Sequence, residues 1–379
     1  MLKLDSPKVD DVSGPTIIRS KLSSRIAGAM NLGASVRINK LGVSIIGGVL
    51  LMIVLVYRNS GSSEGTAEMP LEMAQTGARV SLKKLLAAAI DAADRGGKIV
   101  YQIREEATLH EQSKGKTKEG ANDPVTDGDL KSHMAMFYSI KNAFPGVEVI
   151  SEEHSSSDVN QQAVAPAATS NEEVNSVIAD DLTVPVEDVR VWIDPLDATQ
   201  EYTENLRQYV TTMVCVAVKG LATIGVINKP FSNFIAWGWA GHGISPKLHI
   251  SQDQTGPKDD IAHIIVSRSH TGDVEVVAKS AFGDKTNITQ AGGAGYKTLA
   301  VIQGDADAYV HSTAIKKWDL CAGNAILNAL QGKMTTLDGT SIDYSSREMY
   351  KNEGGLLATL YNHDLYLEKL KVLKSTKSH

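Results

Sequence analysis

The sequence predicts an α/β fold from Val80 onward, on two observations. Short apolar runs rich in β-branched residues, typical of strands, alternate with longer stretches that carry apolar residues at helical spacing. Acidic residues recur at the ends of the strand-like runs or the starts of the helix-like ones, where an α/β fold gathers its functional groups at one edge. With 379 residues, the chain is long enough for one large two-part catalytic unit and further segments.

The N-terminal part is predicted to cross a membrane once. Residues 41–57 are apolar and uncharged, close to the lower length limit of a spanning helix. Their polar surroundings disfavour a buried core helix, and the 40 residues before them are too many for the start of a cleaved signal peptide. Basic residues precede the run and Glu follows it, so the positive-inside rule predicts a type II signal-anchor. Residues 1–40 are then a cytosolic tail and 58–79 a lumenal stem.

The folded region is predicted to have an N-terminal part at 80–253 and a C-terminal part at 254–370, with a tail at 371–379. Asn287 begins an Asn-Ile-Thr glycosylation sequon, which this topology puts in the lumen. Residues 155–187 are rich in Ser, Asn, Gln, Ala and acidic residues, which predicts a flexible surface insertion.

Two helices and a strand are expected before that insertion. Ser81 can cap a helix with one apolar face, which is interrupted at Gly96-Gly97 and then resumes. A second helix starts at Leu130, with Asp129 at its N-terminus in the position of a cap. Residues 147–150 read as a strand, and Glu152 follows its end.

The most informative stretch is Val191–Tyr202, which reads VWIDPLDATQEY. Pro195 has no N–H and a fixed φ, so the strand is expected to end there. Asp194 and Asp197 can then face one locus together with the Leu196 carbonyl, a set of oxygen ligands suited to Mg²⁺, Mn²⁺ or Ca²⁺. An ordinary surface turn is the alternative for this segment taken alone.

The second half of the chain continues the alternation. Residues 291–297 form a glycine-rich turn before a helix, whose backbone N–H groups can cradle an anion. Asp319 stands at the start of a long apolar helix, again in a capping position. Strands are expected at 209–218, 222–228, 235–239, 261–266 and 308–311.

Composition excludes some functions and leaves others open. The net charge is −6, and no basic stripe with interleaved aromatics occurs, so a nucleic-acid polymer is not an expected partner. Cys215 and Cys321 lie in apolar contexts and read as small buried hydrophobes, with a disulfide between them left open.

Four motifs occur together in this order: Pro124-Val125-Thr126-x-x-Asp129, Glu152-Glu153, Trp192–Thr199 and Trp318–Gly323. From Val80 to the C-terminal region the chain thereby resembles the inositol monophosphatase-like, Mg²⁺-dependent, lithium-sensitive phosphatases. The Thr-Gln-Glu-Tyr sequence from Thr199 is more similar to 3′-nucleotidase-type members than to inositol phosphatases. Two features depart from the family: Ala198 stands where most members have Gly, and the insertion at 155–187 lengthens a loop near the site.

The resemblance implies a layered α/β/α/β/α sandwich and a role for each matching residue. Two or three Mg²⁺ ions are implied, with Mn²⁺ left open, and Asp194 would bridge two of them. Asp129 and Thr199 would orient and deprotonate the attacking water. The implied metal ligands are Glu152, Asp194, the Leu196 carbonyl, Asp197 and Asp319, and the implied nucleotide contacts are Ser267, His270, Gly293 and Lys297.

With the predicted topology, the resemblance implies a Golgi membrane enzyme that hydrolyses the 3′-phosphate of adenosine 3′,5′-bisphosphate, a by-product of sulfation, to AMP in the lumen. An inositol monophosphatase is the nearer alternative. A catalytically inactive, membrane-tethered binding protein is the other, although the chain lacks none of the five acidic positions. The oligomeric state is open, and a homodimer is one alternative.

Overall fold

The computed structural model describes residues 77–116, 122–154, 163–250, 261–268 and 274–376. These residues belong to one compact unit, Ala74–His379. Within the described ranges, no helix combines the length and the apolar character that a bilayer span requires. The predicted cytosolic tail, the membrane span at 41–57 and the boundary between residues 253 and 254 all lie outside the described residues.

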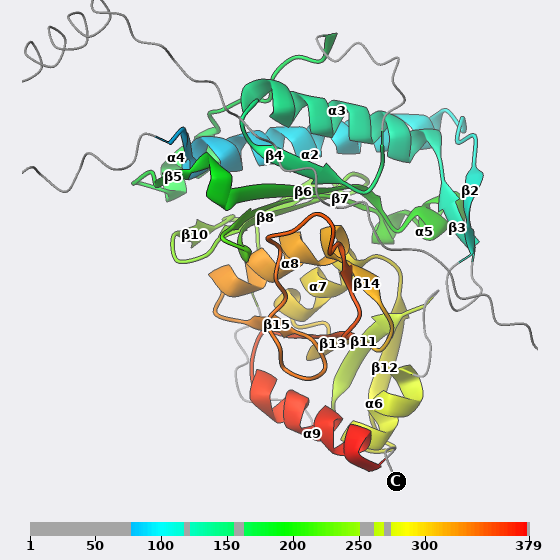
Figure 1. The fold of residues 1–379 in the computed structure, drawn as a ribbon. Helices are drawn as coiled ribbons and strands as arrows, with labels where there is room; N and C mark the ends of the chain where they lie inside the picture. The colour runs from blue at the N-terminus through cyan, green and yellow to red at the C-terminus, as the bar shows by residue number, and fades with distance from the viewer. Residues whose placement is uncertain (1–76, 117–121, 155–162, 251–260, 269–273, 377–379) are drawn as a thin grey trace, which may run out of the picture. The chain divides into compact units, whose positions relative to one another are not determined.

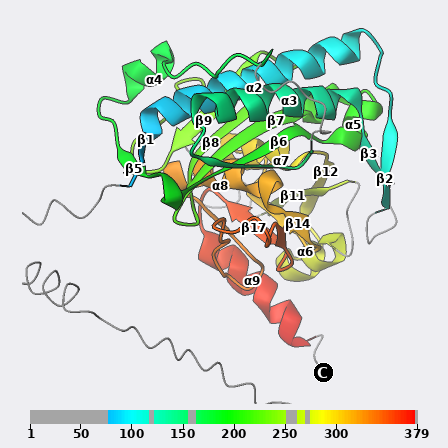
Figure 2. The same ribbon diagram turned by 45° about the horizontal axis from the view of Figure 1, so that its top comes forward.

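The described elements stack in five alternating layers (Figures 1 and 2). Helices α2 and α3 cover one face of a six-stranded sheet, and α7 and α8 lie between that sheet and a five-stranded one. Helices α6 and α9 cover the outer face of the second sheet. Separate hydrophobic clusters fill the interfaces between layers. The predicted α/β/α/β/α sandwich is therefore the observed fold.

The six-stranded sheet has the order β10-β9-β8-β7-β6-β4. All neighbouring pairs are antiparallel except β4 and β6, which run parallel, so the ends of these two strands lie at one edge. The strands span Glu148–Ser151 (β4), Val189–Asp197 (β6), Thr211–Val218 (β7), Leu221–Lys229 (β8), Phe234–Trp239 (β9) and Gly243–Ile244 (β10).

The five-stranded sheet has the order β12-β11-β13-β17-β15. Strand β11 runs parallel to both of its neighbours, and β17 is antiparallel to both of its own. The strands span His263–Ser267 (β11), Asn287–Ala291 (β12), Ala308–His311 (β13), Lys333–Thr335 (β15) and Leu356–Thr359 (β17).

Short two-stranded ribbons and the helices complete the unit. The ribbons pair β1 (Arg79–Ser81) with β5 (Thr183–Pro185), β2 (Gln112–Lys116) with β3 (Asn122–Val125), and β14 (Ile315–Lys316) with β16 (Lys351–Asn352). The helices are α2 (Leu82–Glu105), α3 (Asp127–Ala143), α4 (Glu172–Val177), α5 (Thr199–Thr203), α6 (Val274–Phe282), α7 (Ala294–Gln303), α8 (Lys317–Ala329) and α9 (His363–Thr376).

Helix α2 is continuous, so the predicted interruption at Gly96-Gly97 is wrong. The two glycines serve close packing. A Cβ on Gly96 would lie 2.4 Å from the Met136 sulfur on α3, and one on Gly97 would lie 2.1 Å from the Asn228 amide nitrogen on β8. The chain therefore accepts the helix-destabilising effect of glycine so that α2 can lie close to its neighbours.

Residues 163–187, the described part of the predicted flexible insertion, are mostly exposed but contain the short helix α4, which packs against the fold. Asn171 caps α4 by accepting a 3.0 Å hydrogen bond from the Val174 N–H. Val174 and Ile178 are buried in the cluster between the first sheet and its helices. The polar composition of the segment hid this apolar face at helical spacing, and the flexibility of the insertion stays a prediction.

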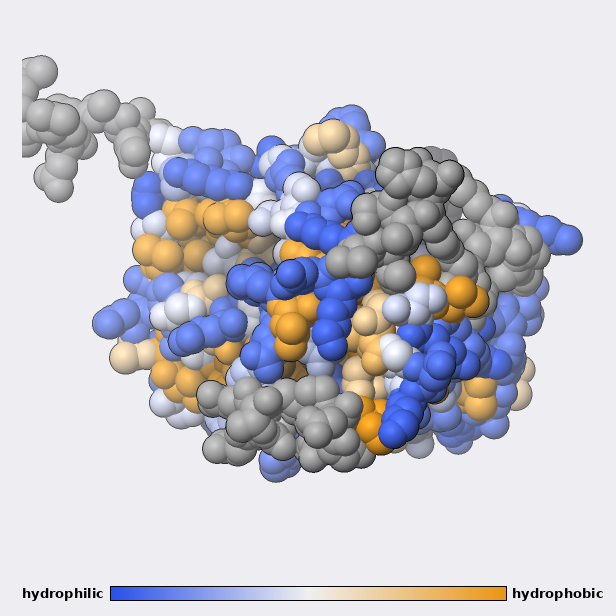
Figure 3. Space-filling model, turned by 90° about the horizontal axis from the view of Figure 1, so that it is seen from below, coloured by the Kyte–Doolittle hydropathy of each residue, from blue (hydrophilic) through white to orange (hydrophobic). Residues whose placement is uncertain are grey.

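The two cysteines form a disulfide, Cys215–Cys321, across 106 residues of sequence. It joins β7 to α8, the helix that carries Asp319. On the outside, hydrophobic side chains lie in separate patches among hydrophilic ones on the face seen from below (Figure 3). Separate patches are normal on a protein surface, so this face does not test the predicted alternative of a homodimer.

Candidate active site

Residues predicted from the four motifs meet at one cavity of about 360 Å³ between the two sheets. Its walls come from strand ends of both sheets and from the starts of helices α5, α7 and α8. The predicted residues that line it are Glu152, Asp194, Leu196, Asp197, Thr199, Ser267, Gly293, Lys297 and Asp319.

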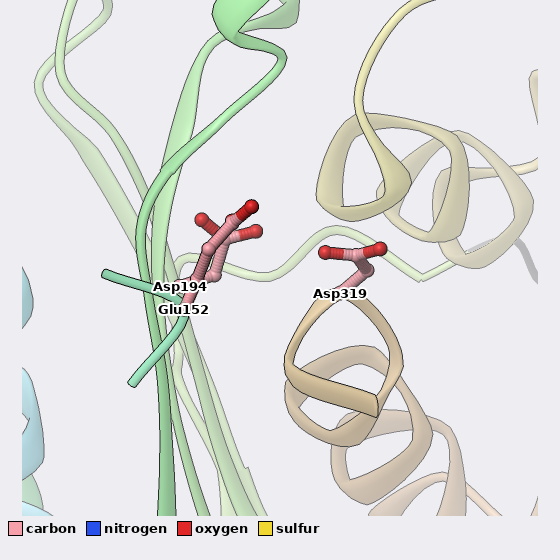
Figure 4. Close-up of side chains that lie close together, drawn as sticks. All are labelled: Glu152, Asp194 and Asp319. Atoms are coloured by element: carbon pink, nitrogen blue, oxygen red, sulfur yellow. The ribbon is translucent and has the colours of Figure 1, made fainter. Parts of the chain in front are cut away.

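Three carboxylates form the centre of the site (Figure 4). Glu152 follows β4, Asp194 lies on β6, and Asp319 is in the first turn of α8, facing the other two across the gap. Each offers an oxygen within 4.8 Å of the others. Three convergent hard oxygen donors with room for water and a phosphate fit Mg²⁺ or Mn²⁺ and do not suit a soft metal.

Strand β6 continues through Pro195 to Asp197, so the predicted end of the strand at the proline is wrong. Asp194 pairs with Met213 and Asp197 with Thr211, which leaves one extra residue on β6 between these pairs. This irregularity is a bulge, which lets a proline stay within a strand and turns side chains from their alternating positions. Both carboxylates therefore reach the cavity, as predicted, by a different backbone geometry.

Asp197 is held by the glycine-rich turn. Its two carboxylate oxygens accept hydrogen bonds from the Ala294 N–H (3.0 Å) and the Gly295 N–H (2.8 Å), and Thr211 donates a third (2.9 Å). The anion that these amides at the start of α7 cradle is thus a side chain of the protein. The bonds fix Asp197 at the edge of the carboxylate cluster, and its role as a metal ligand remains a prediction.

Thr199 and Asp129 form the second functional pair. The Thr199 hydroxyl lies 2.9 Å from Asp129 Oδ1 and 3.1 Å from the Leu196 carbonyl oxygen. Asp129 Oδ2 accepts hydrogen bonds of 2.7 Å from both the backbone N–H and the hydroxyl of Thr126, which caps α3. The observed cap is therefore Thr126 and not the predicted Asp129, which completes the capping box while its other oxygen faces Thr199.

Burial and neighbouring negative charges raise the pKa values of several acids in the site. Burial raises the pKa of Asp129 to about 7, in spite of its hydrogen bonds. Burial and the neighbouring Glu152 raise the pKa of Asp319 to about 8. Burial, followed by the charges of Glu152 and Asp197, raises the pKa of Asp194 well above its usual range. A cation bound among these groups would relieve the repulsion between their ionised forms.

Glu152 behaves differently because it has cationic neighbours. Burial alone would raise its pKa, but the ammonium groups of Lys316 and Lys114 outweigh that effect and lower it. Lys316 Nζ lies 2.9 Å and Lys114 Nζ 3.2 Å from Glu152 Oε1, and Lys114 also pairs with Glu153. Neither lysine was predicted as a site residue. The two consecutive lysines before Trp318-Asp319 were a signal in the sequence, whereas nothing placed Lys114 near Glu152.

The predicted substrate residues have unequal outcomes. Ser267 ends β11 at the cavity wall, and Gly293 has a φ of 67°, in the region that favours glycine. Lys297 is buried and donates to the Gly293 carbonyl at 2.6 Å, and burial lowers its pKa to about 8. His270 lies outside the described residues, and the exposed Asn287 starts the edge strand β12 and does not line the cavity.

Sequence reasoning also missed a buried acid beside the site. Glu201, on α5, is 2% exposed and lies 3.3 Å from the Arg268 guanidinium, which also binds Glu204 at 2.6 Å. Arg268 directly follows Ser267, so this ion pair ties the predicted nucleotide wall to the helix of Thr199.

The profile of the inositol monophosphatase family matches residues 81–374. The chain belongs to the inositol monophosphatase family. Membership confirms the resemblance drawn from the four motifs. The matched region contains every predicted metal ligand and both predicted catalytic residues.

Two curated relatives are similar to nearly the whole chain. The Golgi-resident adenosine 3′,5′-bisphosphate 3′-phosphatase of Mus musculus is 46% identical over 358 residues, covering 90% of this chain and 98% of the relative. Inositol monophosphatase 3 of Danio rerio is 45% identical over 349 residues, with the same coverage of 90% and 98%.

Solved structures agree on the fold. The extragenic suppressor protein suhB of Bartonella henselae has a TM-score of 0.57 at 16% identity, covering 76% of this chain and 98% of that structure. CysQ of Bacteroides thetaiotaomicron, a bacterial family member, has a TM-score of 0.53 at 21% identity, covering 74% and 98%. At these identities the likeness shows the fold alone.

Proposed function

We propose that the protein is a Mg²⁺-dependent phosphomonoesterase that removes the 3′-phosphate of adenosine 3′,5′-bisphosphate and releases AMP and phosphate. The observation that carries the proposal is the carboxylate cluster of Glu152, Asp194 and Asp319 beside the hydrogen-bonded pair of Thr199 and Asp129. The substrate is supported by the name of the Mus musculus relative, which is similar over 90% of the chain.

Each group of the site has a role in this reaction. Glu152, Asp194, Asp319, the Leu196 carbonyl and Asp197 would hold the metal. Bound Mg²⁺ polarises a phosphate oxygen and lowers the pKa of water. Thr199 would orient the attacking water by accepting its hydrogen bond, and Asp129 would take the proton of the Thr199 hydroxyl in turn. Water is then a sufficient nucleophile, and no covalent phosphoenzyme is required.

The nucleoside part of the substrate would lie along the wall formed by Ser267, Gly293 and Lys297. The chain itself requires a glycine at position 293, since a Cβ there would lie 2.6 Å from the Tyr209 carbonyl oxygen, and its contact with the nucleotide stays a proposal from the family resemblance. Burial disfavours the Lys297 ammonium and lowers its pKa to about 8, whereas the charge of Asp197 favours the ammonium, and a bound 5′-phosphate would favour it further. His270, which lies outside the described ranges, is also proposed to contact the nucleotide.

An inositol phosphate is the rival substrate, supported by the name of the Danio rerio relative. Kinetics with purified protein and Mg²⁺ separate the two, using phosphate release from adenosine 3′,5′-bisphosphate and from inositol 1-phosphate at matched concentrations. We expect the larger kcat/KM for the nucleotide. A larger kcat/KM for inositol 1-phosphate would refute the substrate, and no release from either would refute the phosphatase.

The proposal extends to location, because relatives of Mus musculus and Homo sapiens are named Golgi-resident. Residues 41–57 would anchor the chain as a type II protein with its catalytic part in the lumen. Asn287 would then carry a glycan, which its exposure allows. In intact vesicles the catalytic part should resist added protease. After the vesicles are dissolved in detergent, endoglycosidase should shift the mass of the wild type but not that of an N287Q variant. Digestion without detergent would contradict this topology.

A further inference from the structure

Lys316 connects two of the three clustered carboxylates. Its side-chain Nζ lies 2.9 Å from Glu152 Oε1, and its backbone N–H donates to Asp319 Oδ2 at 3.3 Å. Lys316 ends β14 and directly precedes α8, so the segment that orients Asp319 also delivers the ammonium group. Figure 4 shows Glu152 and Asp319 on opposite sides of the gap, and the two contacts of Lys316 join these sides.

The ammonium lies where the charge balance of the site requires a cation. Glu152, Asp194 and Asp319 bring oxygens within 4.8 Å of one another, and Asp194 is 1% exposed. Carboxylates this close repel one another strongly unless a cation or protons neutralise them. In the described residues, Lys316 and Lys114 are the cations on Glu152, and both approach the same oxygen, Oε1.

We propose that Lys316 is a built-in counter-ion of the metal site, which neutralises Glu152 when no metal is bound and competes with Mg²⁺ for it. This inference rests on the proposed use of Glu152 as a Mg²⁺ ligand. Mg²⁺ binds carboxylate oxygens at about 2.0–2.1 Å and demands near-ideal geometry, so an ammonium on the same carboxylate competes by charge and by position. Lys316 is thus a positioning residue that weakens Mg²⁺ binding and stabilises the metal-free protein.

Substitutions of Lys316 can test its charge, and a second lysine in the same cavity provides the control. K316Q removes the charge and keeps a polar side chain, whereas K316R keeps the charge. Lys351 lines the same cavity, but its ammonium lies 5.7 Å above the Tyr350 ring and forms no ion pair with a carboxylate of the described residues. K351Q therefore removes one positive charge from the cavity without touching the metal ligands.

The test is Mg²⁺ titration calorimetry on the full-length protein stripped of metal. We expect K316Q to lower the Mg²⁺ dissociation constant roughly tenfold. K351Q should change it by less than about twofold, and K316R should match the wild type or bind more weakly. An unchanged or larger dissociation constant in K316Q would overturn the proposal, as would a wild type that binds no Mg²⁺.

Thermal unfolding supplies a second readout and controls for misfolding. Without metal, K316Q should unfold at a lower temperature than the wild type, and saturating Mg²⁺ should remove the difference. Equal stability of the two metal-free proteins would also count against the proposal. If K316Q binds Mg²⁺ more tightly but the wild type has no phosphatase activity, only the proposed function is refuted. If the wild type is active but K316Q binds Mg²⁺ no more tightly, only this inference is refuted.

Discussion

The Thr199 hydroxyl lies 2.9 Å from the Asp129 carboxylate, across 70 residues of sequence. The hydroxyl also lies 3.1 Å from the Leu196 carbonyl, and its single proton can serve only one acceptor at a time. When the proton points to Asp129, a lone pair of the hydroxyl is free to accept a hydrogen bond from water. The same contact therefore joins α3 to α5 and provides a route for a proton.

Removal of that hydroxyl should slow the chemical step. T199A is expected to lower kcat by about 10²–10⁴-fold with little change in KM, the range typical of a lost proton-transfer group. T199S should keep most of the activity. The matched control is T203A on the same helix, because the Thr203 hydroxyl bonds only the local Gln200 carbonyl. Steady-state kinetics decide the matter, and a T199A enzyme as active as T203A would refute the relay.

Asp194 should be indispensable for metal binding. D194N keeps the size of the side chain but removes its negative charge. Asp194 is 1% exposed, and the charges of other acids surround it. We expect turnover and the Mg²⁺-induced rise in unfolding temperature to disappear, while the metal-free variant becomes more stable than the wild type because repulsion falls. D188N, which alters an acid just before β6, is the control. Wild-type turnover by D194N would disprove the metal assignment.

The metal-free protein should lose stability as pH rises. The folded pKa values of Asp129 and Asp319 are raised to about 7 and about 8, above the value of about 3.9 in an unfolded chain. The folded state therefore holds more protons, and stability falls from about pH 4 to pH 8. Denaturant unfolding at several pH values with a chelator should show this slope, and saturating Mg²⁺ should flatten it. A metal-free stability that rises over this window would contradict the assignment.

Ala198 offers a substitution that should stabilise the protein. It adopts φ 71° and ψ 46°, a left-handed conformation that costs a residue with a Cβ about 1–2 kcal/mol. A198G should therefore raise the free energy of unfolding, by roughly 0.5–1 kcal/mol after the greater freedom of glycine in the unfolded chain is subtracted. A198V should destabilise it. Chemical denaturation measures both, and a less stable A198G would show that the Ala198 side chain contributes packing.

The sequence predicted the chemistry of the site better than its backbone. Asp194 and Asp319 were identifiable because no single structural role explains acids both at the turn after a strand and at the start of a helix, whereas a shared metal site does. The bulge at Pro195 was not identifiable, because a proline normally ends a strand and the partner strand that tolerates it lies elsewhere in the chain. The roles of Thr126 and Asp129 in one capping box likewise needed the observed start of α3.

Long-range pairings account for most of what the sequence did not predict. The helix around Val174 was obscured by the polar residues around it, and Gly96-Gly97 reads as a break until the neighbouring helix is seen. Lys114 and Lys316 come from segments about 200 residues apart, and only the fold places both on Glu152. Such contacts leave no local pattern.

The site is proposed to remove the 3′-phosphate of a nucleoside bisphosphate with the help of Mg²⁺. The most direct measurement is the identity of the nucleotide left after complete turnover of adenosine 3′,5′-bisphosphate, resolved by chromatography and phosphorus NMR, with Mg²⁺ and with a chelator. We expect adenosine 5′-monophosphate in the presence of Mg²⁺ and no turnover in its absence. Adenosine 3′-monophosphate as the product, or equal turnover in the chelator, would contradict this proposal.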